Sequence, residues 1–222
     1  MQDDSSQKYV AAKHYFGGNA DAYDERRDQK PKWNEENRLV ESYVAKLPRG
    51  ASLLDVPFGT GRFAPAYLNA GLRVAGADIS ADMIAQAKRR FGSKIADFDL
   101  RTAAAEALPY GEQSFDYLIC NRFIKWLPSE SIVEAVAKEF RRVCRGEMLI
   151  QVKVRESKIE SAAAFWRPIA RLFKMDDSRR PTARYSLRQL EHVFVRDGWA
   201  LTEVVDASKV GRGVKYLILR KS

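Results

Sequence analysis

Short apolar runs alternate with amphipathic stretches along most of the chain. The runs have the length of buried strands, and the stretches between them repeat apolar residues at the spacing of one helix face. Strands and helices that alternate in this way predict an α/β fold with an open, mostly parallel sheet. Strands are predicted at 52–56, 72–77, 98–102, 115–120, 148–154, 199–205 and 214–220.

Helix boundaries are predicted from residues that favour helix ends. Ser80 is expected to cap a helix whose inner face carries Met83, Ile84 and Ala87. Gly146 is expected to turn the chain into the strand at 148–154. Further helices are predicted at 20–47, 62–69, 129–143, 159–175 and 186–195.

The last two predicted strands are joined by the short segment SKVGRG. A connection this short cannot carry a crossover, so the strands at 199–205 and 214–220 should pair antiparallel. The length of 222 residues suits a single domain.

A glycine-rich turn follows the first predicted strand, in the segment LLDVPFGTGRF. Gly59 and Gly61 permit unusual backbone angles, and their missing side chains let a ligand lie against the main chain. The helix that follows offers unpaired N–H groups to an anionic or polar ligand group. A tight strand–helix connection without a ligand is the simpler alternative.

Polar residues gather where the predicted strands end. Asp55, Asp78 and Asn121 end the first, second and fourth strands, and Ala105 and Glu106 follow the third. Ligands of parallel sheets bind beyond the carboxyl ends of the strands, and an acid ending the second strand can accept hydrogen bonds from ribose hydroxyls. These positions together predict one nucleoside site.

Three segments carry a resemblance to a known family: LLDVPFGTGRF, GADISADMIAQAKRR and AEALPYGEQSFDYLICNRF. They resemble class I S-adenosylmethionine-dependent methyltransferases, most closely the large group that acts on small molecules. The resemblance implies a Rossmann-like, seven-stranded, mostly parallel sheet with helices on both faces and an antiparallel last strand. It also implies an N-terminal helical lid, a helical insertion after strand five, and S-adenosyl-L-methionine as cofactor.

On this basis the chain is one methyltransferase domain with four parts. They are a helical cap at 1–48, a cofactor-binding core at 51–154, a substrate-cap insertion at 155–185, and a helix with a strand pair at 186–222.

The resemblance also implies residue roles. Asp55 and the backbone of 57–61 would hold the methionine end of the cofactor, Asp78 the ribose hydroxyls, and Ile79 the adenine face. The implied cofactor-binding residues are Asp55, Pro57, Gly59, Thr60, Gly61, Asp78, Ile79, Ala105, Glu106, Asn121 and Arg122. For Asp55 the alternative is a cap on nearby amides, and for Asp78 a surface acid beside a helix.

The chain departs from the family pattern at several positions. Pro57 replaces the first glycine of the usual D-x-G-x-G turn, bulky Phe58 follows it, and Ala104 stands where relatives often carry an acid. Relatives often place a histidine near 125–126, where this chain has none. The catalytic residue therefore stays open, with His14, Tyr23 and Lys125 as candidates.

An acceptor that arrives already ionised needs no strong base. Arg167, Arg171 and Arg179 of the insertion lie among aromatic residues and would suit an anionic acceptor. The predicted function is therefore methyl transfer to an O, N or C nucleophile of a small metabolite or glycan-like acceptor, with an anionic acceptor as one option.

Two other functions stay open. The net charge of +9 suits a tRNA or rRNA methyltransferase, although Asn121 is not followed by the Pro–Pro–Tyr of base amino-methylation. A non-catalytic protein that binds S-adenosylmethionine and regulates or scaffolds a partner is the third candidate. Neither the acceptor nor the oligomeric state follows from the sequence.

Composition bears on the compartment. The start, MQDDSSQKYV, is unlike a secretory signal, and no apolar run has the length of a membrane span. Cys120 and Cys144 form neither a disulfide framework nor a metal cluster, so we expect a cytoplasmic protein without a metal.

Overall fold

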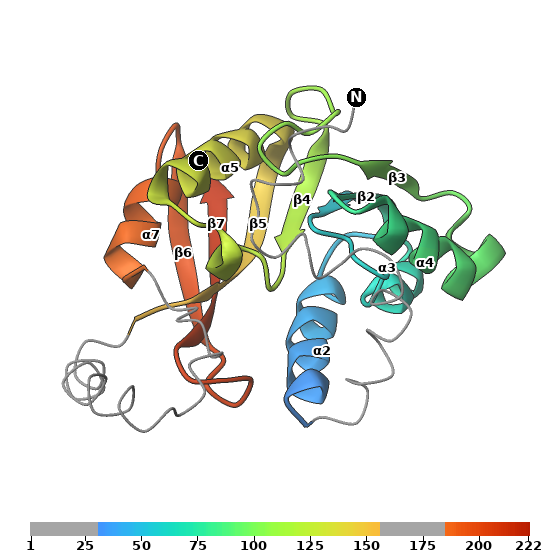
Figure 1. Cartoon of the computed structure of the whole chain (residues 1–222), viewed down its shortest axis with the longest axis horizontal. Helices are drawn as coiled ribbons and strands as arrows, with labels where there is room; N and C mark the ends of the chain where they lie inside the picture. Colours follow the sequence, from blue (N-terminus) through green and yellow to red (C-terminus); the bar gives the residue numbers. More distant parts are fainter. Residues whose placement is uncertain (1–30, 156–184) are drawn as a thin grey trace, which may run out of the picture.

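Seven strands form one sheet in the order β3-β2-β1-β4-β5-β7-β6 (Figure 1). The structure is a computed structural model that describes residues 31–155 and 185–222. The strands are β1 (Ser52–Asp55), β2 (Arg73–Asp78), β3 (Asp99–Thr102), β4 (Phe115–Cys120), β5 (Cys144–Lys153), β6 (Trp199–Asp206) and β7 (Val214–Lys221).

Parallel pairing runs from β3 to β5, and β7 is antiparallel to both of its neighbours. Asp55 lies opposite Gly76 of β2 and Ile119 of β4. The carboxyl ends of β1, β2 and β4 therefore lie along one edge of the sheet. This arrangement confirms the predicted mostly parallel sheet with an antiparallel last strand.

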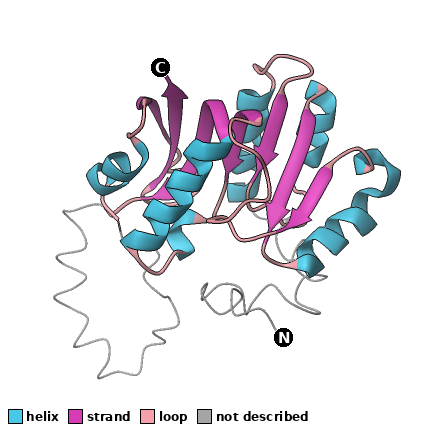
Figure 2. Ribbon diagram, turned by 90° about the horizontal axis from the view of Figure 1, so that it is seen from above, coloured by secondary structure: helices cyan, strands magenta, loops and turns pink. Residues whose placement is uncertain are grey.

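Helices cover both faces of the sheet (Figure 2). One face is covered by α2 (Pro31–Val44), α3 (Ala64–Ala70) and α4 (Ala81–Phe91), and the other by α5 (Glu130–Val143) and α7 (Leu187–Phe194). Two 3-10 turns, η4 (Gly92–Ile95) and η5 (Ile124–Trp126), join elements. The predicted start of the first helix at 20–30 and the predicted helix at 159–175 lie outside the described residues.

Two apolar layers result from the alternation of side chains along each strand. Leu53 packs in the layer under α2, α3 and α4, whereas its neighbour Leu54 packs in the layer under α5 and α7. Both leucines are fully buried, and burial of such a side chain stabilises the fold by about 1.5–3 kcal/mol. The apolar residues of β1 therefore contribute to the core on both faces of the sheet.

The helix after β2 has the predicted cap and inner face. The Ser80 hydroxyl accepts a hydrogen bond from the Met83 N–H, and Met83, Ile84 and Ala87 are buried. Because Ser80 follows β2 closely, this cap fixes the direction in which the chain leaves the strand. Ser129 and Ser186 cap α5 and α7 in the same way.

The predicted start of the fifth strand is wrong. β5 begins at Cys144, and Gly146 lies within the strand instead of in a turn before it. A Cβ atom at Gly146 would lie 2.4 Å from the carbonyl oxygen of Asp116, at a point where the register between β4 and β5 shifts. Glycine is needed here because two backbones approach closely, which the sequence pattern does not distinguish from a turn.

No helix in the ranges 31–155 and 185–222 is long and apolar enough to cross a bilayer. Within the same ranges, no group of three or more His, Cys, Asp or Glu side chains is arranged to hold a metal ion.

Candidate functional site

The glycine turn crosses the carboxyl edge of the sheet between β1 and α3. Gly59 and Gly61 have φ angles of +58° and +74°, in the left-handed region that favours glycine. A Cβ atom at Gly59 would meet no atom within 4 Å, so open space lies beside this part of the main chain. A ligand group can therefore approach the turn backbone, as the sequence predicts.

Phe58 lies behind the turn and not in front of it. Its ring fills the space where a Cβ atom on Gly76 would lie, 2.5 Å from Phe58 Cδ2, and it contacts Phe98 edge to face. The side chain is buried in the layer under α2, α3 and α4. The bulky residue that departs from the family pattern thus leaves the turn accessible. The preceding Val56–Pro57 peptide bond is cis.

Asp78 joins the end of β2 to the glycine turn. Its Oδ2 accepts a hydrogen bond from the Gly59 N–H at 2.9 Å, and its Oδ1 accepts one from the Ser80 N–H at 2.9 Å. Burial raises the pKa of Asp78 to about 6, although both backbone N–H groups act in the opposite direction. A carboxylate has about four acceptor positions, so Asp78 can accept further hydrogen bonds from hydroxyl groups.

Asp55 lies at the end of β1 and accepts a hydrogen bond from a residue of α3. The Tyr67 hydroxyl donates a hydrogen bond to its Oδ2 at 2.9 Å, and both side chains are buried. Burial raises the pKa of Asp55 to about 8; the Tyr67 hydrogen bond lowers it and the Asp78 charge raises it further. Two buried carboxyl groups with raised pKa values flank the turn, which is typical of functional sites.

Asn121 follows β4 on the same edge. Its side chain is buried, and its Oδ1 lies 3.5 Å from the Tyr216 hydroxyl, which donates to it. Its Nδ2 has no hydrogen-bond partner among the described residues. A buried amide donor of this kind is available to a ligand acceptor atom.

Arg122, the next residue, has a φ of 60°, which is unusual for a residue other than glycine. Its backbone N–H donates to Gln151 Oε1 at 3.1 Å, and this bond holds the conformation. Its guanidinium donates to Glu36 Oε2 at 3.2 Å.

Glu36 of α2 is the centre of a buried polar cluster. The guanidinium of Arg62, from the glycine turn, donates to Glu36 Oε2 at 2.5 Å, while Gln151 of β5 donates to Glu36 Oε1 at 3.0 Å. Burial raises the pKa of Glu36, but the Arg122 charge and the hydrogen bonds from Arg62 and Gln151 outweigh it and lower the pKa. The cluster ties α2 to the turn, to the end of β4 and to β5.

Trp33 lies against both arginines of this cluster. The guanidinium carbon of Arg62 is 3.8 Å from the centre of the indole ring, and that of Arg122 is 4.9 Å away. Arg62 also donates to the Trp33 carbonyl oxygen at 2.8 Å. These contacts fix the start of α2 over the turn.

The residues expected at the adenine side follow the ends of β2 and β3. Ala105 is buried, and Ile79 is half-buried against the layer under α5 and α7. The Oε2 atom of Glu106 is buried without a hydrogen-bond partner among the described residues. Thr60, in the turn itself, is buried.

Of the three candidate catalytic residues, only Lys125 is described. It lies in η5, with its ammonium 5.4 Å from the centre of the Trp126 ring. His14 and Tyr23 lie outside the described residues, as do the arginines of the insertion.

The structure thus brings Asp55, Gly59, Asp78, Asn121 and Arg122 to one edge of the sheet. Sequence reasoning missed four residues around them, because each belongs to an element whose apolar pattern gave it no separate signal. These are Glu36, Tyr67, Gln151 and Tyr216.

Comparisons with known proteins agree with this geometry. Residues 53–147 match the family model described as a methyltransferase domain. The malonyl-[acyl-carrier protein] O-methyltransferase of Enterobacter lignolyticus is 28% identical over 136 residues, which cover 60% of this chain and 52% of that protein. The demethylmenaquinone methyltransferase of Renibacterium salmoninarum is 40% identical over 79 residues, covering 36% of this chain and 31% of that protein. The aligned parts are therefore about half of the length of the first relative and about a third of the second.

Solved structures share the fold at low sequence identity. The magnesium protoporphyrin IX methyltransferase of Synechocystis, with bound SAH, superposes with a TM-score of 0.65 at 16% identity, over 85% of this chain and 84% of that one. A SAM-dependent methyltransferase of Aquifex aeolicus superposes with a TM-score of 0.64 at 15% identity, over 89% of this chain and 96% of that one. The chain has a Rossmann-like methyltransferase fold. Residues 53–147, which include the glycine turn and the ends of β1, β2 and β4, are the part that matches the methyltransferase domain.

Proposed function

We propose that this protein transfers a methyl group from S-adenosyl-L-methionine to a nucleophile of a small-molecule acceptor. The observation that carries the proposal is the pair of buried carboxyl groups, Asp55 and Asp78, at the ends of adjacent strands on either side of the glycine turn. Open space beside Gly59 leaves the main chain between them accessible.

The residues at this edge fit the cofactor. Asp78 has acceptor positions left for the two ribose hydroxyls, and Asp55 with the backbone of 57–61 is assigned to the methionine end. Asn121 Nδ2 and Glu106 Oε2, which have no partner in the part of the chain that the structure describes, are suited to the cofactor's amino-acid and adenine ends respectively. Ile79 and Ala105 supply apolar contact for the adenine ring.

The cofactor supplies an activated methyl group on a sulfonium, and the chain supplies position. In-line transfer needs the acceptor nucleophile aligned with the methyl group and water excluded. The Glu36 cluster and Trp33 hold α2 over the glycine turn, which is where the proposed cofactor lies. The parts of the chain at 1–48 and 155–185 are assigned to the cap over cofactor and substrate.

For the acceptor, we propose a chemical class and not an individual compound. Three relatives are malonyl-[acyl-carrier protein] O-methyltransferases, and a structural neighbour is a magnesium protoporphyrin IX methyltransferase. An acceptor with a carboxylate therefore suits this chain, and such an acceptor needs no strong base when it arrives ionised. His14, Tyr23 and Lys125 stay as candidate bases for an acceptor that carries a proton. The two unpaired, buried cysteines suit a reducing, cytoplasmic setting.

Calorimetry with S-adenosylhomocysteine tests the cofactor assignment. Asp78→Ala should weaken binding by about tenfold or more, because hydrogen bonds to a charged group contribute about 1.5–3 kcal/mol. Asp99→Ala is the control, since Asp99 is an exposed aspartate on β3. Equal affinities for wild type and Asp78→Ala would contradict the assignment.

Labelled S-adenosylmethionine then tests the activity. Incubation of the protein with a cell extract should label a small molecule, and Asp78→Ala should abolish or strongly reduce that labelling. Binding of the cofactor without transfer of label to any acceptor would instead support the non-catalytic alternative. Transfer of label to bulk tRNA would support the RNA methyltransferase.

A further inference from the structure

The Glu36 cluster carries more positive than negative charge. Arg62 and Arg122 both pair with the same oxygen of Glu36, and in the part of the chain that the structure describes neither guanidinium pairs with another carboxylate. The three side chains are 15%, 23% and 3% exposed, in the order Arg62, Arg122 and Glu36. Among the described residues one positive charge is thus left without a counterion, in surroundings that water reaches poorly and where an unpaired charge is unfavourable.

A second, independent observation concerns the residue that precedes Arg122 in the chain. Asn121 precedes Arg122 and is 7% exposed, so its side chain is more than nine-tenths buried. Its amide Nδ2 has no acceptor among residues 31–155 and 185–222. Its other end is fixed, because Oδ1 lies 3.5 Å from the Tyr216 hydroxyl and that hydroxyl accepts from Gln151 Nε2 at 2.9 Å. Within the described ranges, a buried donor without an acceptor thus directly precedes, in the chain, an arginine whose cluster has one positive charge in excess.

Arg122 is also held in place from several sides. Its φ of 60° is retained by the hydrogen bond from its N–H to Gln151, and its guanidinium lies 4.9 Å from the Trp33 ring. Backbone strain of this kind persists where the surrounding structure enforces it, and it is often found at functional sites. The guanidinium is therefore presented in one direction at the carboxyl edge of the sheet.

We propose that the guanidinium of Arg122 and the Asn121 amide form a binding site for a carboxylate at the end of β4. The planar fork of a guanidinium matches the two oxygens of a carboxylate, and the amide adds a further donor. The carboxylate has two possible sources, the amino-acid end of the cofactor or the acceptor. The inference rests on the proposed function, which places cofactor and acceptor at this edge.

The binding of two nucleosides tests whether the cofactor supplies the carboxylate. S-adenosylhomocysteine has the carboxylate, whereas 5′-methylthioadenosine lacks the whole amino-acid part. If the cofactor fills the site, Arg122→Gln should weaken S-adenosylhomocysteine binding by about tenfold or more and leave 5′-methylthioadenosine binding unchanged. Arg145→Gln is the control, because it removes the same charge near the start of β5, at the opposite edge of the sheet.

The binding of a small dicarboxylate tests whether the acceptor supplies the carboxylate. Malonate is the probe, titrated into the protein with and without S-adenosylhomocysteine. If the acceptor fills the site, Arg122→Gln and Asn121→Ala should each weaken malonate binding by several fold, and Arg122→Gln should bind both nucleosides as wild type does. Arg122→Lys is the second variant should Arg122→Gln not fold; it keeps the charge, loses the fork and should weaken the same ligand less.

The proposal is overturned if Arg122→Gln or Arg122→Lys binds all three ligands as Arg145→Gln does. It is also overturned if Arg122→Gln weakens both nucleosides equally, because that result indicates a general loss of the cofactor site. Failure of the proposed function gives a different result, namely wild-type protein that binds neither nucleoside. In that case malonate binding to wild type and its loss in Arg122→Gln still decide whether the carboxylate site exists.

Discussion

Asp55 and Glu36 are both buried carboxyl groups, yet their surroundings shift their pKa values in opposite directions. In the described part of the chain Asp55 has one hydrogen-bond donor, the neutral Tyr67 hydroxyl, so burial dominates and its pKa rises to about 8. Glu36 has two guanidinium groups and an amide as donors, so its charged form is favoured. Two carboxyl groups that look alike in the sequence therefore differ in charge state near neutral pH.

This difference predicts how stability depends on pH. A carboxyl group whose folded pKa lies above its unfolded value of 3.8 favours the folded state below that value, and its contribution is lost as pH rises to the folded pKa. The free energy of unfolding of the cofactor-free protein should thus fall between about pH 4 and 8. The slope from Asp55 is at most about 1.4 kcal/mol per pH unit. Asp78, with a pKa of about 6, adds to the fall in the lower half of this range.

Asp55→Asn should remove most of this dependence between about pH 6 and 8, because the amide stays neutral. Urea denaturation at several pH values measures it, with Asp99→Asn as the control on an exposed aspartate. Parallel pH profiles for Asp55→Asn and wild type would show that Asp55 is ionised throughout.

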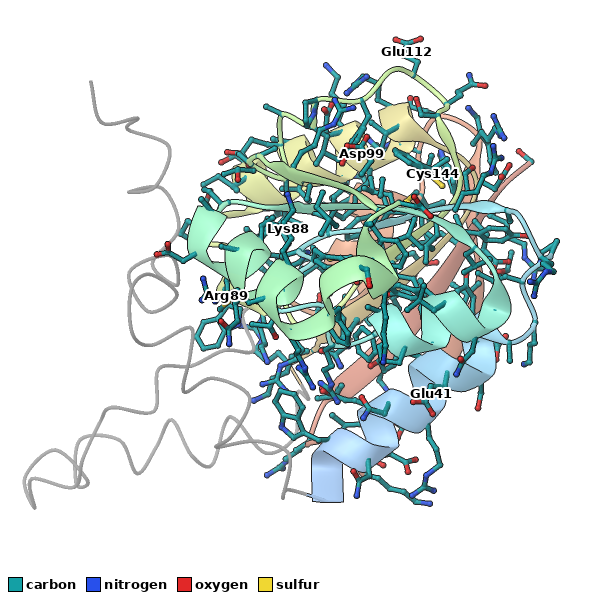
Figure 3. All side chains as sticks on the ribbon, turned by 90° about the vertical axis from the view of Figure 1, so that its right-hand side faces the viewer. Glu41, Lys88, Arg89, Asp99, Glu112 and Cys144 are labelled. Carbon is teal, nitrogen blue, oxygen red and sulfur yellow. The ribbon has the colours of Figure 1, made fainter. Side chains whose placement is uncertain are left out.

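At the scale of elements, the Glu36 cluster joins α2 to the sheet. Glu36→Gln should destabilise the protein by roughly 3 kcal/mol, because it leaves Arg62 and Arg122 buried without a carboxylate. The matched control is Glu41→Gln, which changes an exposed glutamate on the same helix (Figure 3). Its effect should stay within about 0.5 kcal/mol. Similar losses for both variants in urea denaturation would contradict the role given to the cluster.

The approach of β5 to β4 gives a second prediction for the elements. Gly146→Ala should lower the free energy of unfolding by about 1–3 kcal/mol, because its Cβ atom would lie 2.4 Å from the Asp116 carbonyl oxygen and one strand would have to move. Gly211→Ala is the control, since its Cβ atom would make only an ordinary contact with Val214 at 3.4 Å. A Gly146→Ala protein as stable as Gly211→Ala would show that the strands separate without cost.

Most of the secondary structure could be predicted from the sequence because local patterns determine it. The strands at β1, β2 and β4 and the helices capped by Ser80, Ser129 and Ser186 lie within about two residues of their predicted bounds. The start of β5 could not be predicted, because a glycine required by a neighbouring backbone looks the same in the sequence as a glycine in a turn.

The candidate site was predictable to the extent that it lies at strand ends. Asp55, Asp78 and Asn121 each follow an apolar run, and the parallel order of β2, β1 and β4 places them on one edge. Glu36 and Gln151 were not predictable, because they are 115 residues apart and meet only after α2 packs on the sheet.

At the scale of the whole molecule, ligand binding should couple to global stability. S-adenosylhomocysteine at a hundred times its Kd should add about 2.7 kcal/mol to the free energy of unfolding. For a chain of this size that corresponds to a rise in Tm of about 5–10 °C. Thermal unfolding with and without the ligand measures it, and Asp78→Ala should show a clearly smaller rise at the same concentration. An unchanged Tm for wild type would contradict cofactor binding.

The sequence by itself determined how strands and helices follow one another along the chain, the glycine turn, and the acids that end the first two strands. These features are predictable because periodicity and turn chemistry act over a few neighbouring residues. Only the tertiary structure decided which side chains neutralise one another. Glu36, Arg62, Arg122 and Gln151 come from four separate elements, and their charges and hydrogen bonds match only once those elements pack. The excess positive charge of the Glu36 cluster and the Asn121 amide without a partner, both seen among the described residues, are therefore properties of the fold.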